Sequence, residues 1–154
     1  LALSTGARKM EIWGLRWRDV DLNAGQATLR ETKNRHTRSV PIQGYALELM
    51  KQKSRVRRID TDFVFPSKVD PQKPFDFRRA WEAVLRKAEI DDFRWHDLRH
   101  SAGSYLAMSG ASVRDIAEIL GHKTLQMAMR YSHLTEKHSA SVVRVMNEKM
   151  FGKY

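Results

Sequence analysis

Residues 95–134, WHDLRHSAGSYLAMSGASVRDIAEILGHKTLQMAMRYSHL, decide the architecture expected of this chain. Apolar residues recur along the stretch at spacings of three and four, which is typical of helices that bury one face. Gly110 and Gly121 interrupt it, and glycine is the residue that most readily ends a helix. The stretch therefore predicts three successive helices, over residues 95–110, 112–122 and 124–134.

Each of these helices has an apolar stripe that we expect to face a core. The stripes comprise Leu98, Ala102, Tyr105 and Leu106, then Val113, Ile116, Ala117 and Leu120, and last Leu125, Ala128 and Met129. Ser112 and Asp115 have the spacing of a capping box at the start of the second helix. Tyr131 lies about 120° from the third stripe in an α-helix, so its hydroxyl is expected to point away from the core.

The remaining residues predict a small sheet and further helices. GQATLRETKNRHTRSVPI, residues 25–42, has the alternation of a β-hairpin with a polar turn around Lys33 and Asn34. DFVFPS, residues 62–67, predicts a short strand that Pro66 ends. Helices are predicted over residues 9–17, 45–58, 77–90 and 135–150, and the one over 77–90 has a core-facing stripe of Ala80, Trp81, Val84, Leu85 and Ala88. The expected fold class is mainly α with a small antiparallel β-sheet (α+β).

The charge balance makes a polyanion the first partner to consider. Lys and Arg number 28 against 18 Asp and Glu, which gives the 154 residues a net charge of +10. There is no cysteine, so thiolate nucleophiles, zinc–thiolate sites and disulfides are excluded. No apolar run approaches the roughly 20 residues needed to span a membrane. We expect a cytoplasmic protein, and the start without methionine suggests a piece of a longer chain.

The chain offers every group that breaking a phosphodiester bond requires. Attack on phosphorus adds negative charge to the nonbridging oxygens, and preorganised arginines stabilise that charge by gripping two oxygens at once. A hydroxyl can act as the nucleophile, and a proton donor must meet the leaving oxygen. The candidates are Arg8 at a helix start, Lys33 at a hairpin tip, His96 and Arg99 on one helix face, His122 at a helix boundary, and Tyr131.

Two other classes of protein fit parts of the same sequence. Residues 112–134 have the helix, glycine turn and helix of a helix-turn-helix DNA reader, which would leave the RWHDLRH segment without a task. His96, Asp97 and His100 have a spacing that suits a metal-dependent phosphoesterase. Such sites need further carboxylates converging from elsewhere, and the sequence offers no second cluster, so we expect no metal.

Three separated segments resemble the boxes of the tyrosine recombinase (phage integrase) family, in its C-terminal catalytic domain. TGARKMEIWGLRWRDVDL looks like the first-arginine box, with Arg8 at the arginine position and Glu11 at the supporting acidic position. TKNRHTRSVPI is similar to the hairpin that carries the family's lysine, here Lys33. The 95–134 stretch resembles the second box, and its matching residues are His96 and Arg99 of His-x-x-Arg, His122 of Leu-Gly-His, and the nucleophile Tyr131.

The resemblance implies a transesterification mechanism. Tyr131 would attack the scissile phosphate and leave a 3′-phosphotyrosyl link. Lys33 would protonate the departing 5′ oxygen, and His96 would assist proton removal from the tyrosine. The nonbridging oxygens would be held by the remaining cations, Arg8, Arg99 and His122. A 5′ hydroxyl of a second strand then reverses the step, so neither a metal nor a nucleotide cofactor is required.

The resemblance also implies partners and a domain organisation. Family members join double-stranded DNA duplexes as four protomers, and the segment after the tyrosine often packs on a neighbour, here the helix over residues 135–150. Residues 1–154 would be one catalytic domain, without the family's N-terminal core-binding domain. The protein would be encoded by a bacterium or phage and associated with the nucleoid. A type IB topoisomerase, which shares the chemistry but relaxes supercoils without strand exchange, stays open as an alternative.

Overall fold

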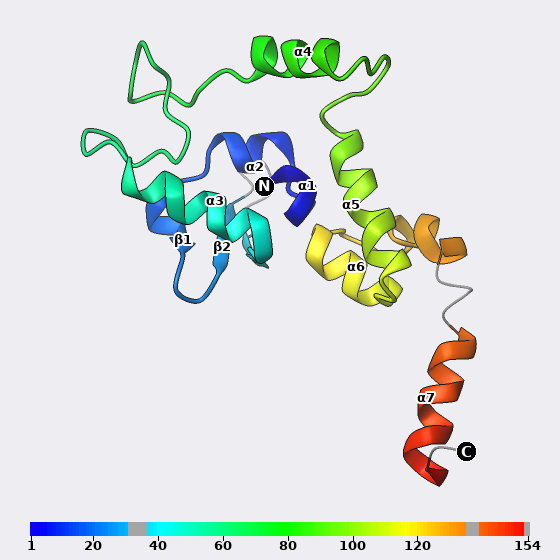
Figure 1. Ribbon diagram of the computed structural model, residues 1–154. Coiled ribbons are helices and arrows are strands. Elements are labelled where there is room, and N and C mark those ends of the chain that lie inside the picture. Colours follow the sequence, from blue (N-terminus) through cyan, green and yellow to red (C-terminus); the bar gives the residue numbers. More distant parts are fainter. Residues whose placement is uncertain (31–36, 135–138, 153–154) are drawn as a thin grey trace. The chain divides into compact units, whose positions relative to one another are not determined.

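The computed structural model describes residues 1–30, 37–134 and 139–152. The chain is mainly helical with one small antiparallel sheet, which confirms the predicted fold class (Figure 1). It divides into two compact units, Leu1–His100 and Ser101–Tyr154. The elements of the first unit are α1 (Ala2–Thr5), α2 (Lys9–Trp13), the 3-10 helix η1 (Trp17–Asp19), β1 (Val20–Asp21), β2 (Gln26–Arg30), β3 (Thr37–Pro41), α3 (Gly44–Arg55), α4 (Arg78–Lys87) and the start of α5 (Asp97–Met108). The second unit holds the rest of α5, α6 (Val113–Leu120), the 3-10 helices η2 (Leu125–Met127) and η3 (Met129–Leu134), and α7 (Ser139–Phe151).

The sheet of the first unit is built on the hairpin that the alternating residues predict. β2 pairs antiparallel with β3, and Ala27 lies opposite Val40 while Leu29 lies opposite Arg38. The apolar members of these pairs are buried, because one face of the hairpin covers the core of this unit. β1, which the sequence does not predict, adds a third strand beside β2 through Val20 opposite Ala27.

The first predicted helix is shorter than the sequence indicates. α2 ends at Trp13 and not at Trp17. The Trp17 N–H donates instead to the Asp62 carbonyl at 2.8 Å, so the chain leaves the helix to pair with a distant segment. A local pattern of apolar spacing does not contain that pairing, because tertiary contacts override helix propensity.

The predicted strand over residues 62–67 is wrong. Phe63 and Pro66 form isolated bridges, with Arg16 and Pro74 respectively, and the segment is otherwise a loop between α3 and α4. The bridge between the two prolines needs no proline N–H, because the Phe75 N–H donates to the Phe65 carbonyl and the Ser67 N–H donates to the Lys73 carbonyl, each at 2.8 Å.

The core-facing stripe predicted over residues 77–90 is also wrong. α4 forms inside that range, but it has no buried residue, and Val84 is 57% exposed. Trp81 packs against Trp95 and Phe93, with ring centroids 5.1 and 6.0 Å away. Helical periodicity identifies an apolar face but not the surface that covers it, so the pattern over-predicts burial here.

The second unit is built around α6, which the sequence predicts correctly. The Asp115 N–H donates to the Ser112 hydroxyl at 3.1 Å, and the Ser112 N–H donates to the Asp115 carboxylate at 2.9 Å, so the capping box is confirmed. Gly121 ends the helix with a φ of 66°, in the left-handed region that favours glycine. Ile116 and Leu120 are fully buried, as predicted.

Residues 124–134 do not form the predicted α-helix. They form η2 and η3, which are 3-10 helices with about three residues per turn. Ala128 and Tyr131 therefore lie on the same side, and both are buried. The prediction that the Tyr131 hydroxyl points away from the core is wrong, because the helical period is three and not 3.6. Since no second α-helix follows α6 directly, the segment also lacks the recognition helix that a helix-turn-helix reader needs.

Three residues assigned to the core stripes of residues 95–134 are exposed instead: Tyr105, Leu125 and Met129. Met129 is exposed because a three-residue period turns it about 120° from Ala128, and Leu125, which lies in the separate 3-10 helix η2, is exposed as well. Tyr105 is exposed because the buried face of α5 includes Ala107, and two helical positions are about 160° apart around the axis.

The last described helix is α7, Ser139–Phe151, and its residues 139–150 fall inside the helix predicted over 135–150. Residues 135–138 lie outside the described part of the chain. The apolar side chains of α7 are exposed: Val142, Val143, Val145, Met146, Met150 and Phe151. Neither α7 nor any other described helix is long and apolar enough to span a membrane.

Candidate active site

Arg8 is fixed at the start of α2 by the acidic residue one turn later. Arg8 is the N-cap residue, with extended backbone, and its N–H donates to Oε2 of Glu11 at 2.6 Å. A carboxylate at this position of a helix captures an N–H that has no partner inside the helix. Nη1 of Arg8 also donates to Oε1 of Glu11 at 3.3 Å. The predicted supporting role of Glu11 therefore has a geometric basis, because Glu11 contacts both ends of Arg8.

A second arginine that the sequence analysis missed shares the same carboxylate. Arg38, on β3, donates from Nη2 to Oε2 of Glu11 at 2.9 Å and from Nη1 to Oε1. The side chain of Glu11 is 2% exposed and that of Arg38 is 16% exposed. The signal was present in the hairpin: Arg38 pairs with the buried Leu29, so it lies on the inward face, where a cation needs an anionic partner.

Arg99 brings the start of α5 to the segment that precedes Arg8. It is only 5% exposed, and its Nη1 donates to the Gly6 carbonyl at 2.8 Å, across a sequence separation of 93 residues. Gly6 has a φ of 61°, so the chain turns sharply between α1 and α2 at this contact. The two predicted arginine segments are therefore in contact within the first unit.

His96 lies one helical turn before Arg99 in this electropositive environment. Its ring is exposed and packs edge-on against His100, with the ring centroids 5.0 Å apart. Partial desolvation lowers the pKa of His96 from the ordinary value of 6.5, and the positive charges of Arg99 and Arg8 lower this pKa further. The imidazole is therefore neutral near neutral pH and can accept a proton.

Asp97 is engaged by an arginine, which weakens the metal-site interpretation. The Arg94 N–H and guanidinium both donate to the Asp97 carboxylate, at 2.7 Å and 3.2–3.3 Å. Arg94 thereby lowers the pKa of Asp97. Among the residues that the structure describes, no group of three or more histidine, aspartate or glutamate side chains is placed to hold a metal ion.

In the second unit, Tyr131 lies against Gly103 of α5. A Cβ atom at Gly103 would be 2.5 Å from Cζ of Tyr131 and 2.8 Å from both Cε1 and the hydroxyl oxygen. Tyr131 is 4% exposed, and it belongs to the cluster of Ala107, Ile116 and Leu120. The absence of a side chain at Gly103 therefore leaves room for the aromatic ring of the candidate nucleophile. The sequence does not predict this contact.

His122 is positioned by the end of α6. Its N–H donates to the Ala117 carbonyl at 2.8 Å, immediately after the left-handed Gly121. This bond satisfies one of the carbonyls that a helix end leaves without an N–H partner. The backbone at His122 is thus fixed, as the predicted helix boundary requires.

The six predicted catalytic residues divide among three parts of the chain. Arg8, His96 and Arg99 are gathered in the first unit, together with the supporting Glu11. His122 and Tyr131 belong to the second unit. Lys33 lies outside the described residues.

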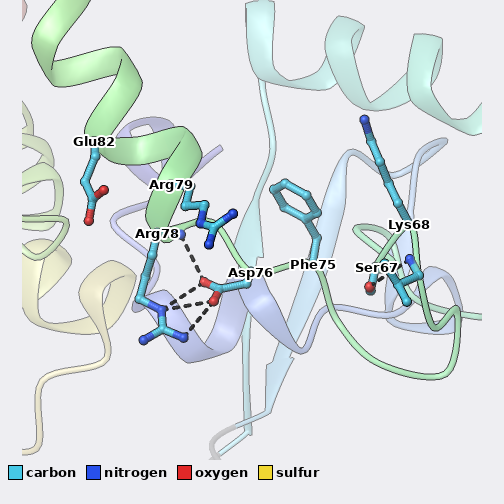
Figure 2. Close-up of a pocket in the computed structure, with 8 residues that line it drawn as sticks. Ser67, Lys68, Phe75, Asp76, Arg78, Arg79 and Glu82 are labelled. Atoms are coloured by element: carbon cyan, nitrogen blue, oxygen red, sulfur yellow. Dashed lines mark hydrogen bonds and ion pairs between the residues drawn. The ribbon is translucent and has the colours of Figure 1, made fainter.

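A surface hollow in the first unit is lined by none of these residues. Its lining includes Lys68, Asp76, Arg78 and Arg79, and it lies between the loop over 67–76 and α4 (Figure 2). The Arg78 guanidinium donates to the Asp76 carboxylate at 3.0 and 2.7 Å, and it lowers the pKa of Asp76 to about 2. Because the Asp76 carboxylate partly offsets the charge of Arg78, Arg78 attracts a phosphate less strongly than an unpaired arginine would.

Comparisons with known proteins agree on one family. Residues 1–138 match the model of the phage integrase family. The chain is 37% identical over 135 residues to the shufflon-specific DNA recombinase of Escherichia coli, covering 87% of this chain and 33% of that protein. It is 30% identical over 165 residues to the integrase of Salmonella phage P22, covering 98% of this chain and 42% of that protein. The chain therefore spans less than half the length of these curated relatives.

Solved structures give the same result. The catalytic domain of bacteriophage HP1 integrase matches with a TM-score of 0.70 and 28% identity, over 99% of this chain and 82% of that chain. The crystal structure of XerA recombinase matches with a TM-score of 0.75 and 26% identity, over 99% of this chain and 57% of that chain.

Proposed function

Because the chain belongs to the phage integrase family, we propose that residues 1–154 are the catalytic domain of a site-specific DNA recombinase or integrase. The observation that carries the proposal is the contact of Arg99 with the Gly6 carbonyl, which joins the two arginine segments within one unit. Two arginines on adjoining segments suit a phosphodiester, because each guanidinium offers a planar pair of N–H donors to nonbridging oxygens. The net charge of +10 favours double-stranded DNA as the partner.

The reaction begins with the hydroxyl of Tyr131. Its oxygen attacks the scissile phosphorus, the bond from phosphorus to the 5′ oxygen breaks, and a 3′-phosphotyrosyl ester forms. His96 accepts the tyrosine proton, which its lowered pKa supports, and Lys33 gives a proton to the departing 5′ oxygen. A 5′ hydroxyl from the second DNA strand then attacks the ester and releases the tyrosine.

The transition state is stabilised by fixed positive charge. Arg8, Arg99 and His122 hold the two nonbridging oxygens as negative charge builds on them. The backbone N–H of each of these residues is hydrogen-bonded, which supports this role because preorganised donors need no rearrangement during the reaction. The phosphate ester energy is conserved in the phosphotyrosyl link, so the reaction needs no metal and no nucleotide cofactor.

The full-length protein acts on DNA as a tetramer in which α7 packs on a neighbouring protomer. The exposed apolar side chains of α7 support this arrangement, because a second copy of the chain would remove them from water. The protein works in the cytoplasm of a bacterium, in association with the nucleoid.

A suicide substrate tests the proposal directly. The full-length protein is incubated with duplex DNA nicked next to the cleavage site, so that the released fragment diffuses away and the covalent adduct accumulates. A slowly migrating species on a denaturing gel is expected for the unaltered protein and not for Tyr131→Phe, which should still shift the DNA on a native gel. An adduct that persists in Tyr131→Phe would show that another residue is the nucleophile.

The adduct assay, together with plasmid relaxation and EDTA treatment, separates the alternative functions. A helix-turn-helix regulator would bind DNA without forming an adduct, and Arg99→Ala would alter its affinity alone. A type IB topoisomerase would form the adduct and relax supercoiled plasmid without exchanging strands. Activity that is lost on adding EDTA would favour a metal-dependent phosphoesterase.

A further inference from the structure

We propose that the hollow between the loop over 67–76 and α4 is a second phosphate-binding site, at which Arg79 and Lys68 contact the DNA backbone away from the scissile phosphate. The inference rests on the proposed function, because it assigns the hollow to the same duplex. It begins from two cations that line this hollow and have no ion-pair partner among the residues that the structure describes.

The two arginines at the start of α4 differ in their partners. Arg78 donates from Nε and Nη2 to Oδ2 of Asp76, at 3.0 and 2.7 Å. Arg79 is the next residue and is also exposed, but its side chain makes no hydrogen bond or ion pair within the described part of the chain (Figure 2). The guanidinium of Arg79 therefore keeps its charge and its N–H donors for an anion from outside.

The loop over 67–76 supplies the second unpaired cation. Lys68 is exposed and lines the same hollow as Arg79. Both carboxylates of the lining act on Arg78, because Asp76 and, more weakly, Glu82 raise the pKa of Arg78. Three cations and two carboxylates leave the lining net positive, and the volume of about 690 Å³ is open to a group as large as a backbone phosphate.

Aromatic packing fixes the start of α4 beside the predicted catalytic residues. The ring of Phe77, directly before α4, lies 6.4 Å from the ring of Trp13 and 5.6 Å from that of Trp95, measured between centroids. Trp13 is the last residue of α2, whose N-cap is Arg8, and Trp95 immediately precedes His96. The segment that carries Arg79 is thus packed on both of the segments expected to contact the scissile phosphate.

Electrostatics indicate the same neighbourhood. After the hydrogen bonds from Arg78, the charge of Lys9 also lowers the pKa of Asp76, so the residue that follows Arg8 lies close to the hollow. Double-stranded DNA carries one phosphate per about 3.4 Å of axis on each strand. A duplex with one phosphate at Arg8 therefore presents further phosphates to neighbouring cations.

The other end of α4 offers a matched control. Arg86 is exposed and has no ion-pair partner in the described residues, but it lines a different hollow together with Glu89, Asp91 and Asp92. These carboxylates repel a phosphate. Arg86→Gln therefore removes the same charge from the same helix and should leave DNA affinity unchanged.

The experiment measures the DNA affinity of the full-length protein as a function of salt concentration, in a Tyr131→Phe background so that cleavage does not follow binding. Arg79→Gln should reduce the slope of log affinity against log salt by about 0.9, the contribution of one phosphate. Affinity should then fall about 15-fold at about 50 mM salt and about 4-fold at about 200 mM. The loss should be equal on the nicked substrate and on a duplex of unrelated sequence, because phosphates carry no sequence information.

Further variants test the charge balance of the hollow. Adding Lys68→Gln to Arg79→Gln should reduce the slope by about 1.8 in total. Asp76→Asn should steepen the slope, because it releases Arg78, and the asparagine oxygen can still accept the Arg78 N–H that now donates to Asp76 at 3.0 Å. Asp76→Asn combined with Arg78→Gln removes a balanced pair and should leave the slope unchanged.

Three results would overturn the proposal: an unaltered slope in Arg79→Gln, an equal loss in Arg86→Gln, or a loss confined to one DNA sequence, which would indicate a base contact. Arg79→Lys retains the charge and should keep the slope, and circular dichroism verifies that each variant is folded. Failure of the unaltered protein to form the Tyr131 adduct would contradict the proposed function, whereas the binding comparison would still decide the role of Arg79.

Discussion

Substitution of Gly103 by alanine tests how the candidate nucleophile is held. The added methyl group would lie 2.5 Å from Cζ of Tyr131, whereas carbon atoms in contact are about 3.5–4.0 Å apart. The ring must therefore move by about 1 Å. Ala128 and Leu120, in the same cluster, have no exposed surface, so the ring cannot move without displacing neighbours.

The effect on the rate should exceed the effect on stability. A displacement of about 1 Å in a reacting group can slow a reaction by about 10²-fold, so adduct formation by Gly103→Ala should fall between 10- and 100-fold. Alanine favours a helix over glycine by about 1 kcal/mol, which offsets part of the strain from the displaced ring. We expect the melting temperature to change by only a few degrees.

The assay is single-turnover cleavage of a suicide substrate by the full-length protein, with DNA affinity measured by gel shift. Gly14→Ala serves as the control, because a Cβ at Gly14 would meet only the Met10 carbonyl, at 3.3 Å, and its φ of −86° suits alanine. Gly14→Ala should cleave at the unaltered rate. An unaltered cleavage rate in Gly103→Ala would refute the argument that Gly103 sets the position of the Tyr131 ring during the reaction.

Three further predictions concern capping and protonation. Ser112→Ala removes the N-cap of α6 and should lower the free energy of unfolding by about 1 kcal/mol in urea denaturation. Asp76 should titrate near pH 2 by NMR and return toward its ordinary pKa of 3.8 in Arg78→Gln. Because this pKa is lowered on folding, the ion pair stabilises the fold fully above pH 3.8 and loses its effect as the pH falls through about 2. If His96 is the proton acceptor, the cleavage rate should decline only below pH 6.5, and His96→Ala should abolish that acid limb.

The helices of the second unit illustrate what local sequence signals contain. The Ser112 and Asp115 spacing and the glycine at 121 predict both ends of α6 correctly, because caps depend on residues adjacent to the helix. The alternating residues of the hairpin likewise predict β2 and β3. The exposure of α4 and the end of α2 at Trp13 were not predicted. Both depend on which distant segments contact these helices, and periodicity does not encode such contacts.

The candidate site likewise contains residues that local sequence signals identify and a residue whose role depends on a distant contact. Arg8, His96 and Arg99 were identifiable because their residue types and spacing suit a phosphate, and the first unit brings them together. Arg38 was overlooked because its significance lies in an inward-facing position on β3. A charged residue at an apolar position of an alternating strand indicates a buried partner, and the acidic position of the first segment, Glu11, was available to be that partner.

The orientation of Tyr131 depends on two features that act together. In an α-helix Tyr131 would be rotated by about 60° from Ala128, whereas the three-residue period of η3 places the two in line. A ring brought to that side meets α5 at a separation that only glycine allows, which is why position 103 matters. The tighter period and the missing side chain are therefore complementary parts of one packing arrangement. A change on α5 that leaves the helix intact can for this reason alter the reactivity of a tyrosine far along the chain.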